Sequence, residues 1–127
     1  MPIIGEITIS GDKSISHRAL MLGSLLVGQS KISNVSMSKD VMATIKCLKK
    51  CGINISINNM KVNMNGGKFE KPYGLLDCGN SGTTVRLMLG ILASLNIDAT
   101  LIGDDSLSSR PMDRVIEPLE LMGASFN

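Results

Sequence analysis

The sequence predicts an α+β fold built from βαβαββ units, and three observations support this prediction. The first half of the chain alternates between segments of period 2, which are typical of strands, and segments with helical periodicity. Two of the expected helices are apolar nearly all round, as helices buried on most sides are. The same order starts again after residue 74, which indicates a second unit.

The first unit shows clear strand and helix signals. In "SKDVMATIKCLKKCG", the stripe Val41, Ile45 and Leu48 predicts an amphipathic helix with Ser38 as its N-cap. The predicted elements are a strand over Ile3–Ser10, a helix over Ser16–Val27, a strand over Ser30–Val35, a helix from Ser38 to Gly52, and hairpin strands over Ile53–Ile57 and Met60–Met64.

The second unit is predicted to be incomplete. After a loop over Gly66–Gly74, the expected elements are a helix over Thr83–Leu95, a strand over Asp98–Ile102, a loop over Gly103–Pro111, and a last short helix that Pro118 must start late or kink. The expected strands do not follow "MGASFN", so we expect a single truncated domain over residues 1–127.

Composition excludes several classes of function. A net charge of +2 is too balanced for a protein that binds nucleic acid or an anionic membrane, and three aromatic residues give no platform for stacking bases. Three cysteines without a CxxC pair and one histidine predict reduced thiols, no metal and no cofactor. The start of the chain has no basic leader and no apolar run spans a bilayer, which predicts a cytoplasmic protein.

Three similar polar segments are the most informative feature. Each has glycine, then Asp or Asn, and ends in Ser or Thr, one further residue and arginine. They are "GDKSISHR" at residues 11–18, "GNSGTTVR" at 79–86 and "GDDSLSSR" at 103–110; we call them the first, second and third mouths. The first two lead into apolar helices. Helix N-termini bind phosphate and carboxylate, and arginine adds a planar fork, so converging mouths predict a site for several anionic groups.

Other chemistry is not indicated. Ordinary N-capped helix starts remain an alternative explanation of the mouths. His17 is a lone imidazole, which is more typical of packing than of general base catalysis. The chain has no Ser, His and Asp set, no Cys and His pair and no Walker sequence, so covalent catalysis and nucleotide hydrolysis are not predicted.

The segments "GDKSISHRALML", "LDCGNSGTTVRLMLGILA" and "GDDSLSSRPMDRVIEPLELMGA" resemble the N-terminal part of the 5-enolpyruvylshikimate-3-phosphate synthase family. The resemblance covers essentially the whole chain. It implies an α/β prism with buried helices and outer sheets. It also implies that residues 1–12 are a strand of the family's other domain and that residues 13–127 are roughly the first half of the shikimate-phosphate-binding domain.

The resemblance implies a metal-free transfer of the enolpyruvyl group of phosphoenolpyruvate to the 5-hydroxyl of shikimate 3-phosphate, in the chorismate pathway of aromatic amino acid biosynthesis. Its matching positions imply site residues for each substrate. The expected shikimate 3-phosphate contacts are Lys13, Ser14 and Arg18. The expected phosphoenolpyruvate contacts are Lys13, Asn80, Gly82, Thr83, Arg86 and Arg110, with Lys13 as the catalytic residue. The sequence departs from the family at Lys39, where an acid usually precedes Asp40.

Two alternatives stay open. One is the sister family that acts on a uridine-diphosphate amino sugar (UDP-N-acetylglucosamine), which is disfavoured because Gly103–Pro111 lacks its reactive cysteine. The other is a non-catalytic anion-binding module. Because the family's site lies between two domains, the 127-residue chain alone is expected to be inactive. The full-length family is expected to be monomeric, whereas open sheet edges predict self-association of this fragment.

Overall fold

Ten elements follow one another in the computed structural model, which describes residues 1–127. They are α1 (Lys13–Leu25), β1 (Gly28–Ile32), α2 (Lys39–Lys50), β2 (Asn54–Asn58), β3 (Lys61–Gly66), β4 (Leu76–Asp77), α3 (Gly82–Ser94), β5 (Leu101–Ile102), α4 (Asp105–Ser108) and α5 (Asp113–Leu121). From α1 to β3 their order is the predicted one.

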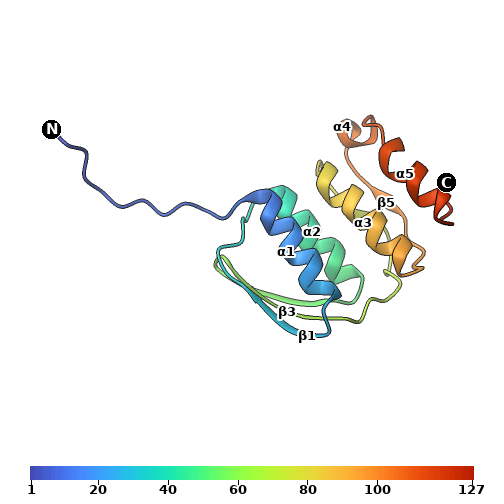
Figure 1. Cartoon of the computed structure of the whole chain (residues 1–127), viewed down its shortest axis with the longest axis horizontal. Coiled ribbons are helices and arrows are strands. Elements are labelled where there is room, and N and C mark those ends of the chain that lie inside the picture. Colours follow the sequence, from blue (N-terminus) through green and yellow to red (C-terminus); the bar gives the residue numbers. More distant parts are fainter.

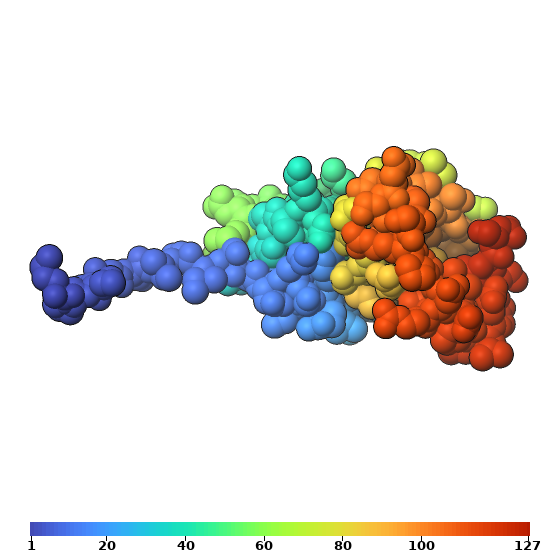
Figure 2. Space-filling model, turned by 90° about the horizontal axis from the view of Figure 1, so that it is seen from above, coloured from blue at the N-terminus to red at the C-terminus, as the bar shows by residue number.

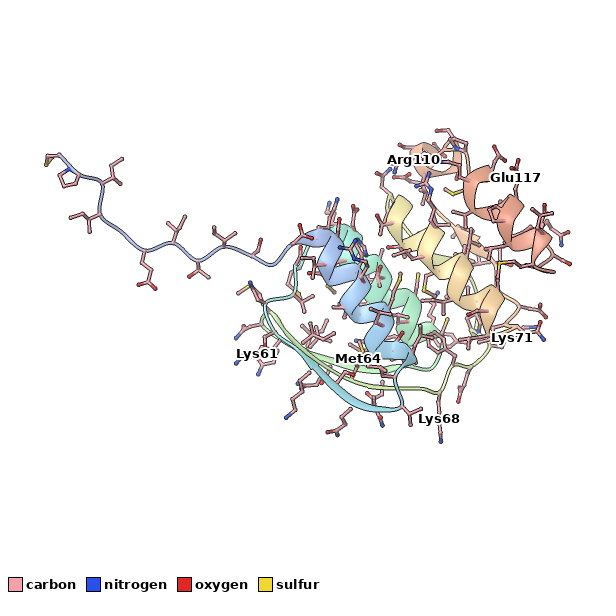
Figure 3. The ribbon with its side chains drawn as sticks, in the orientation of Figure 1. Lys61, Met64, Lys68, Lys71, Arg110 and Glu117 are labelled. Atoms are coloured by element: carbon pink, nitrogen blue, oxygen red, sulfur yellow. The ribbon has the colours of Figure 1, made fainter.

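The first three strands form an antiparallel sheet with β3 in the centre, between β1 and β2. Because side chains alternate along a strand, Val62 and Met64 of β3 are buried whereas Asn63 and Asn65 are exposed. Figure 3 shows Met64 pointing from the sheet toward the helices. The sheet therefore covers one side of α1 and α2 (Figure 1). Its outward face carries the exposed polar side chains.

Helix α2 packs on the sheet beside α1 and contacts α3 as well. The predicted stripe is confirmed, since Val41, Ile45 and Leu48 are at most 1% exposed. Ser38 caps the helix, as predicted, by accepting a 3.4 Å hydrogen bond from the Val41 amide. These apolar residues belong to one continuous core that also includes Met88 and Leu92 of α3.

A short parallel pair, β4 and β5, fixes the second and third mouths beside each other. Leu76 pairs with Leu101 and Asp77 with Ile102. Directly beyond this pair, the Asp104 amide donates a 2.9 Å hydrogen bond to the Gly79 carbonyl. Because parallel strands end at the same edge, the loops that follow them start next to each other.

The strand predicted over Ile3–Ser10 is not formed in this chain. Residues 1–10 are exposed, Ile3 fully so, and they project from the body as an extended segment (Figures 1 and 2). A strand requires a neighbouring backbone to hydrogen-bond with, and no strand of this chain pairs with this segment.

Helix α1 differs from the prediction at both ends and in its burial. It begins at Lys13 because the Asp12 carboxylate caps it, accepting a 2.7 Å hydrogen bond from the Ile15 amide. Burial on most sides is wrong for one face, since Ile15 and Leu22 are more than 60% exposed. That face has no packing partner in the chain.

The C-terminal region corrects two further predictions. Helix α5 begins at Asp113, so Pro118 does not delay its start but lies inside the helix. Because proline has no amide proton to donate there, the alternative expectation of a kink stays a prediction. The loop predicted over Gly103–Pro111 contains α4, which Asp104 caps. The other boundaries shift by a few residues: β1 begins and ends earlier than Ser30–Val35, and β5 is shorter than Asp98–Ile102.

Candidate anion-binding site

Helices α1, α2 and α3 all begin at the same end of the molecule (Figure 1). Each has a side-chain cap at its start, from Asp12, Ser38 and Ser81 respectively. The first-turn amides without a capping partner and the positive ends of three helix dipoles therefore gather at one end. This end carries all three mouths.

The first mouth presents Lys13, Ser14 and Arg18 on the opening turns of α1, and all three residues are exposed. Lys13 Nζ forms a 2.9 Å ion pair with Asp40 Oδ2 at the start of α2. No hydrogen bond or ion pair holds the polar groups of Ser14 or Arg18, so both are free for a ligand. Gly11 is required here by sterics, because a Cβ would collide with the Asn34 carbonyl.

The second and third mouths form one structure. Arg110 Nη2 donates a 2.8 Å hydrogen bond to Asn80 Oδ1, while Asn80 Nδ2 donates to both carboxylate oxygens of Asp104 at 3.0 and 2.9 Å. From α3, Arg86 Nη2 donates to the Pro111 carbonyl at 3.2 Å. Figure 3 shows Arg110 near the beginning of α3.

Gly82 lies beneath two guanidinium groups. A Cβ on this residue would lie 2.6 Å from Arg86 Nη1 and 3.0 Å from Arg110 Nη1. The two side chains therefore converge over the first residue of α3, where an anion can receive charged donors from both. Thr83, the next residue, is exposed.

The structure brings Asn80, Gly82, Arg86 and Arg110 together, but not all predicted residues. One link between the first mouth and the second runs through Asp40: its carboxylate binds Lys13 and its carbonyl accepts a 3.3 Å hydrogen bond from Thr84 Oγ1. Sequence reasoning named Asp40 only as the neighbour of Lys39 and missed this link.

Asp104 is the second partner that sequence reasoning missed. A backbone hydrogen bond from Leu107 and the side-chain hydrogen bond from Asn80 hold the pKa of Asp104 below its ordinary value. It therefore remains charged and orients Asn80, whose carbonyl oxygen then faces Arg110.

His17 is a core residue, which confirms the packing interpretation. Its side chain is completely buried, and Nδ1 lies 2.7 Å from Thr44 Oγ1. Burial lowers the pKa of His17, an effect that Asp40 opposes and Lys13 reinforces. The imidazole is therefore neutral at pH 7.

The three cysteines are free and buried. A hydrogen bond with Cys78, together with burial, raises the pKa of Cys47, and burial raises the pKa of Cys51 to about 11. Both thiols are therefore protonated and poorly nucleophilic. No group of three or more His, Cys, Asp or Glu is arranged to hold a metal ion, and no helix has the length and apolarity needed to cross a membrane.

The buried histidine predicts a pH dependence of stability. Because the folded-state pKa is below the ordinary value of about 6.5, the unfolded chain takes up a proton first as the pH falls. We expect the free energy of unfolding, measured by urea denaturation between pH 7 and pH 5, to decrease with falling pH. The slope should flatten in His17→Asn, the matched control, since the chain has no other histidine. An unchanged slope in that variant would contradict the assignment.

Comparison with solved structures defines the class of fold. An EPSP synthase from Acinetobacter baumannii superimposes with a TM-score of 0.89 at 38% sequence identity, over 95% of this chain and 28% of that chain. The fold is therefore the α+β enolpyruvyl transferase-like fold, an α/β prism of βαβαββ units.

Comparison of sequences defines the family. The chain matches the family model for EPSP synthase (3-phosphoshikimate 1-carboxyvinyltransferase) over residues 1–127, and it belongs to this family. A 3-phosphoshikimate 1-carboxyvinyltransferase from Caldicellulosiruptor saccharolyticus is 50% identical over 126 residues, which are 98% of this chain and 29% of that relative. One from Staphylococcus haemolyticus is 47% identical over 128 residues, again 98% of this chain and 30% of the relative. The chain thus spans less than a third of the length of these relatives.

Proposed function

We propose that this chain is the part of a 3-phosphoshikimate 1-carboxyvinyltransferase that holds the anionic groups of both substrates. The observation that carries the proposal is the convergence of Arg86 and Arg110 over Gly82 at the start of α3. Two planar guanidinium groups and a helix N-terminus together match a ligand with a carboxylate and a phosphate, such as phosphoenolpyruvate. The relatives are 3-phosphoshikimate 1-carboxyvinyltransferases, which favours shikimate 3-phosphate over a uridine-diphosphate sugar as the other substrate.

Each predicted residue receives a role within this proposal. Lys13, Ser14 and Arg18 bind shikimate 3-phosphate, and Lys13 also reaches phosphoenolpyruvate as the catalytic residue. Lys13 must then exchange its Asp40 partner for a substrate anion, which its 54% exposed side chain permits. The phosphoenolpyruvate residues are Asn80, Gly82, Thr83, Arg86 and Arg110.

In the reaction, the methylene carbon of phosphoenolpyruvate takes up a proton while the 5-hydroxyl oxygen loses its proton and bonds to the carbon that carries the phosphate group. The methyl group of this intermediate then loses a proton, which restores the double bond as the carbon–oxygen bond to the phosphate group breaks and inorganic phosphate leaves. Cations fixed before the substrate arrives stabilise the negative charge of the intermediate without reorganising. The groups that move protons are not assigned to this chain.

Within the proposal, residues 1–12 form a strand of the family's other domain, and residues 13–127 are roughly the first half of the shikimate-phosphate-binding domain. The exposed segment before α1 and the unpartnered face of α1 support this division. Strands β1 and β2 are sheet edges, so the isolated chain is expected to self-associate through them. A strictly monomeric chain in sedimentation would contradict that part.

Two proteins test the proposed function: the chain alone, and a chimera of the chain with a relative. The 127-residue chain should bind shikimate 3-phosphate weakly in calorimetry but release no phosphate from phosphoenolpyruvate. A chimera in which the chain replaces the matching part of the Caldicellulosiruptor saccharolyticus enzyme should be active. In that chimera, Arg110→Ala should reduce kcat/KM by about 100-fold, as loss of one preorganised donor does.

The controls separate the outcomes. Arg114→Ala, an exposed arginine of α5 outside the mouths, should leave the chimera's activity unchanged. Transfer by the chain alone would overturn the expectation that it is inactive. If the chimera is active and Arg110→Ala does not reduce its activity, the assigned site is wrong. If the chain is folded but binds neither substrate, it contributes only structure to the enzyme.

A further inference from the structure

A row of fully buried polar side chains crosses the three helices behind the mouths. His17 of α1, Thr44 of α2, and Thr84 of α3 are 0% exposed, and Ser81, the N-cap of α3, is 1% exposed. Successive distances are 2.7 Å from His17 Nδ1 to Thr44 Oγ1, 2.8 Å from Thr44 Oγ1 to Thr84 Oγ1, and 2.7 Å from Thr84 Oγ1 to Ser81 Oγ. Buried polar groups destabilise a core unless they are hydrogen-bonded, so this chain of bonds holds the three helices in one arrangement.

The ends of the row lie at two different mouths. His17 is followed directly by Arg18, and Lys13 lies one turn before it on α1. Ser81 Oγ also accepts a 3.1 Å hydrogen bond from the Thr84 amide, so it sets the start of the helix that carries Gly82. A shift at either end of the row therefore changes the spacing between the first mouth and the second.

The hydrogen-bond geometry also selects a direction for the protons. Thr84 Oγ1 has one proton, for which Ser81 Oγ and the Asp40 carbonyl both compete as acceptors. If Thr84 donates to either, Thr44 must donate to Thr84, and His17 Nδ1 must then donate to Thr44. Nε2, which has no partner, is then a bare acceptor; the opposite direction would bury an unpaired N–H, which is rarer in proteins.

We propose that His17 is a positioning residue: as the neutral Nδ1–H tautomer, it fixes the first mouth relative to the second through Thr44, Thr84 and Ser81. It touches no substrate. This inference rests on the proposed function only where affinity for shikimate 3-phosphate is measured. The site requires the hydrogen bond that His17 makes, not merely the volume that its side chain fills.

Two variants of Thr44 distinguish bonding from packing. Thr44→Val keeps the shape but removes the hydroxyl, whereas Thr44→Ser keeps the hydroxyl but loses a methyl group. We expect Thr44→Val to raise the Kd of the 127-residue chain for shikimate 3-phosphate at least fivefold in calorimetry, and to shift the Gly82 amide resonance. Thr44→Ser should leave both close to the unsubstituted chain.

His17 itself is tested by isosteric replacement and by spectroscopy. His17→Asn places an amide group near the Nδ1 position and should retain most of the affinity, whereas His17→Leu should lose it. Nitrogen NMR at pH 7 should show protonated Nδ1 and unprotonated Nε2. Ser24→Ala, which removes a buried hydroxyl from the far end of α1, is the control and should leave the Kd unchanged.

Several outcomes would overturn the inference. If Thr44→Ser weakens binding more than Thr44→Val, or if Thr44→Val leaves the Gly82 amide unshifted, the row only packs the core. A protonated Nε2 would refute the tautomer. Should the Thr44 variants not fold, Thr84→Val and Thr84→Ser repeat the comparison. If the unsubstituted chain binds no shikimate 3-phosphate, the proposed function fails. The shift of the Gly82 amide resonance and the His17 tautomer still test whether the row of hydrogen bonds couples the helices.

Discussion

Gly82→Ala is expected to weaken binding of phosphoenolpyruvate by at least about tenfold, because one charge-assisted hydrogen bond contributes about 1.5–3 kcal/mol. The new methyl group would lie only 2.6 Å from Arg86 Nη1 and 3.0 Å from Arg110 Nη1. Both contacts are the far ends of flexible side chains, so the guanidinium groups would swing away while the backbone stays in place. Calorimetry on the 127-residue chain and kcat/KM of the chimera measure the effect.

The matched control for this substitution is Gly90→Ala on the same helix. No atom lies within 4 Å of a Cβ at Gly90. Alanine is the better helix former, so this variant should gain about 0.5–1 kcal/mol of stability and keep its affinity. If Gly82→Ala binds as tightly as Gly90→Ala, the two arginines do not form the anion site.

Gly66→Ala is expected to reduce the free energy of unfolding by about 3 kcal/mol, the upper end of the usual cost of overpacking. A Cβ there would lie 2.6 Å from both the Ser24 and the Leu26 carbonyl oxygens and would also collide with the Gly23 carbonyl. These are backbone atoms at the end of α1, so no side chain can move aside. A loss of this size is a large share of the stability of an ordinary domain.

Urea denaturation of the chain measures this loss, with Asn65→Ala as the control. Asn65 precedes Gly66 on β3 but is exposed on the opposite face of the sheet. That variant should change stability by less than about 0.5 kcal/mol, as exposed substitutions usually do. Equal stabilities of the two variants would show that α1 ends differently from the structure described above.

The elements with a regular pattern could be predicted from the sequence. The stripe of α2, its Ser38 cap and the alternation along β2 and β3 are local signals, and each is confirmed. The wrong predictions concern segments whose structure depends on a partner elsewhere in the fold. The pattern of Ile3–Ser10 predicts a strand, but a strand forms only when another strand pairs with it, and none does. The apolar face of α1 is likewise exposed because no element of this chain packs against it.

The candidate site shows the same division. Repetition of the mouths predicted that Arg86 and Arg110 would serve one site, and β4 and β5 do bring their loops together. The roles of Asp40 and Asp104 could not be predicted, because residues 27 and 24 positions apart meet only through the packing of separate elements. The role of every site residue in substrate binding stays a prediction.

The common direction of α1, α2 and α3 has a kinetic consequence. Their dipoles point the same way, so their fields add at the end where the mouths open, and exposed Lys13 and Arg18 extend that field into solvent. A small dianion is then drawn in before it touches any residue, and this long-range attraction is screened by salt. Rising ionic strength should therefore slow the capture of such a ligand more than it hastens the ligand's escape.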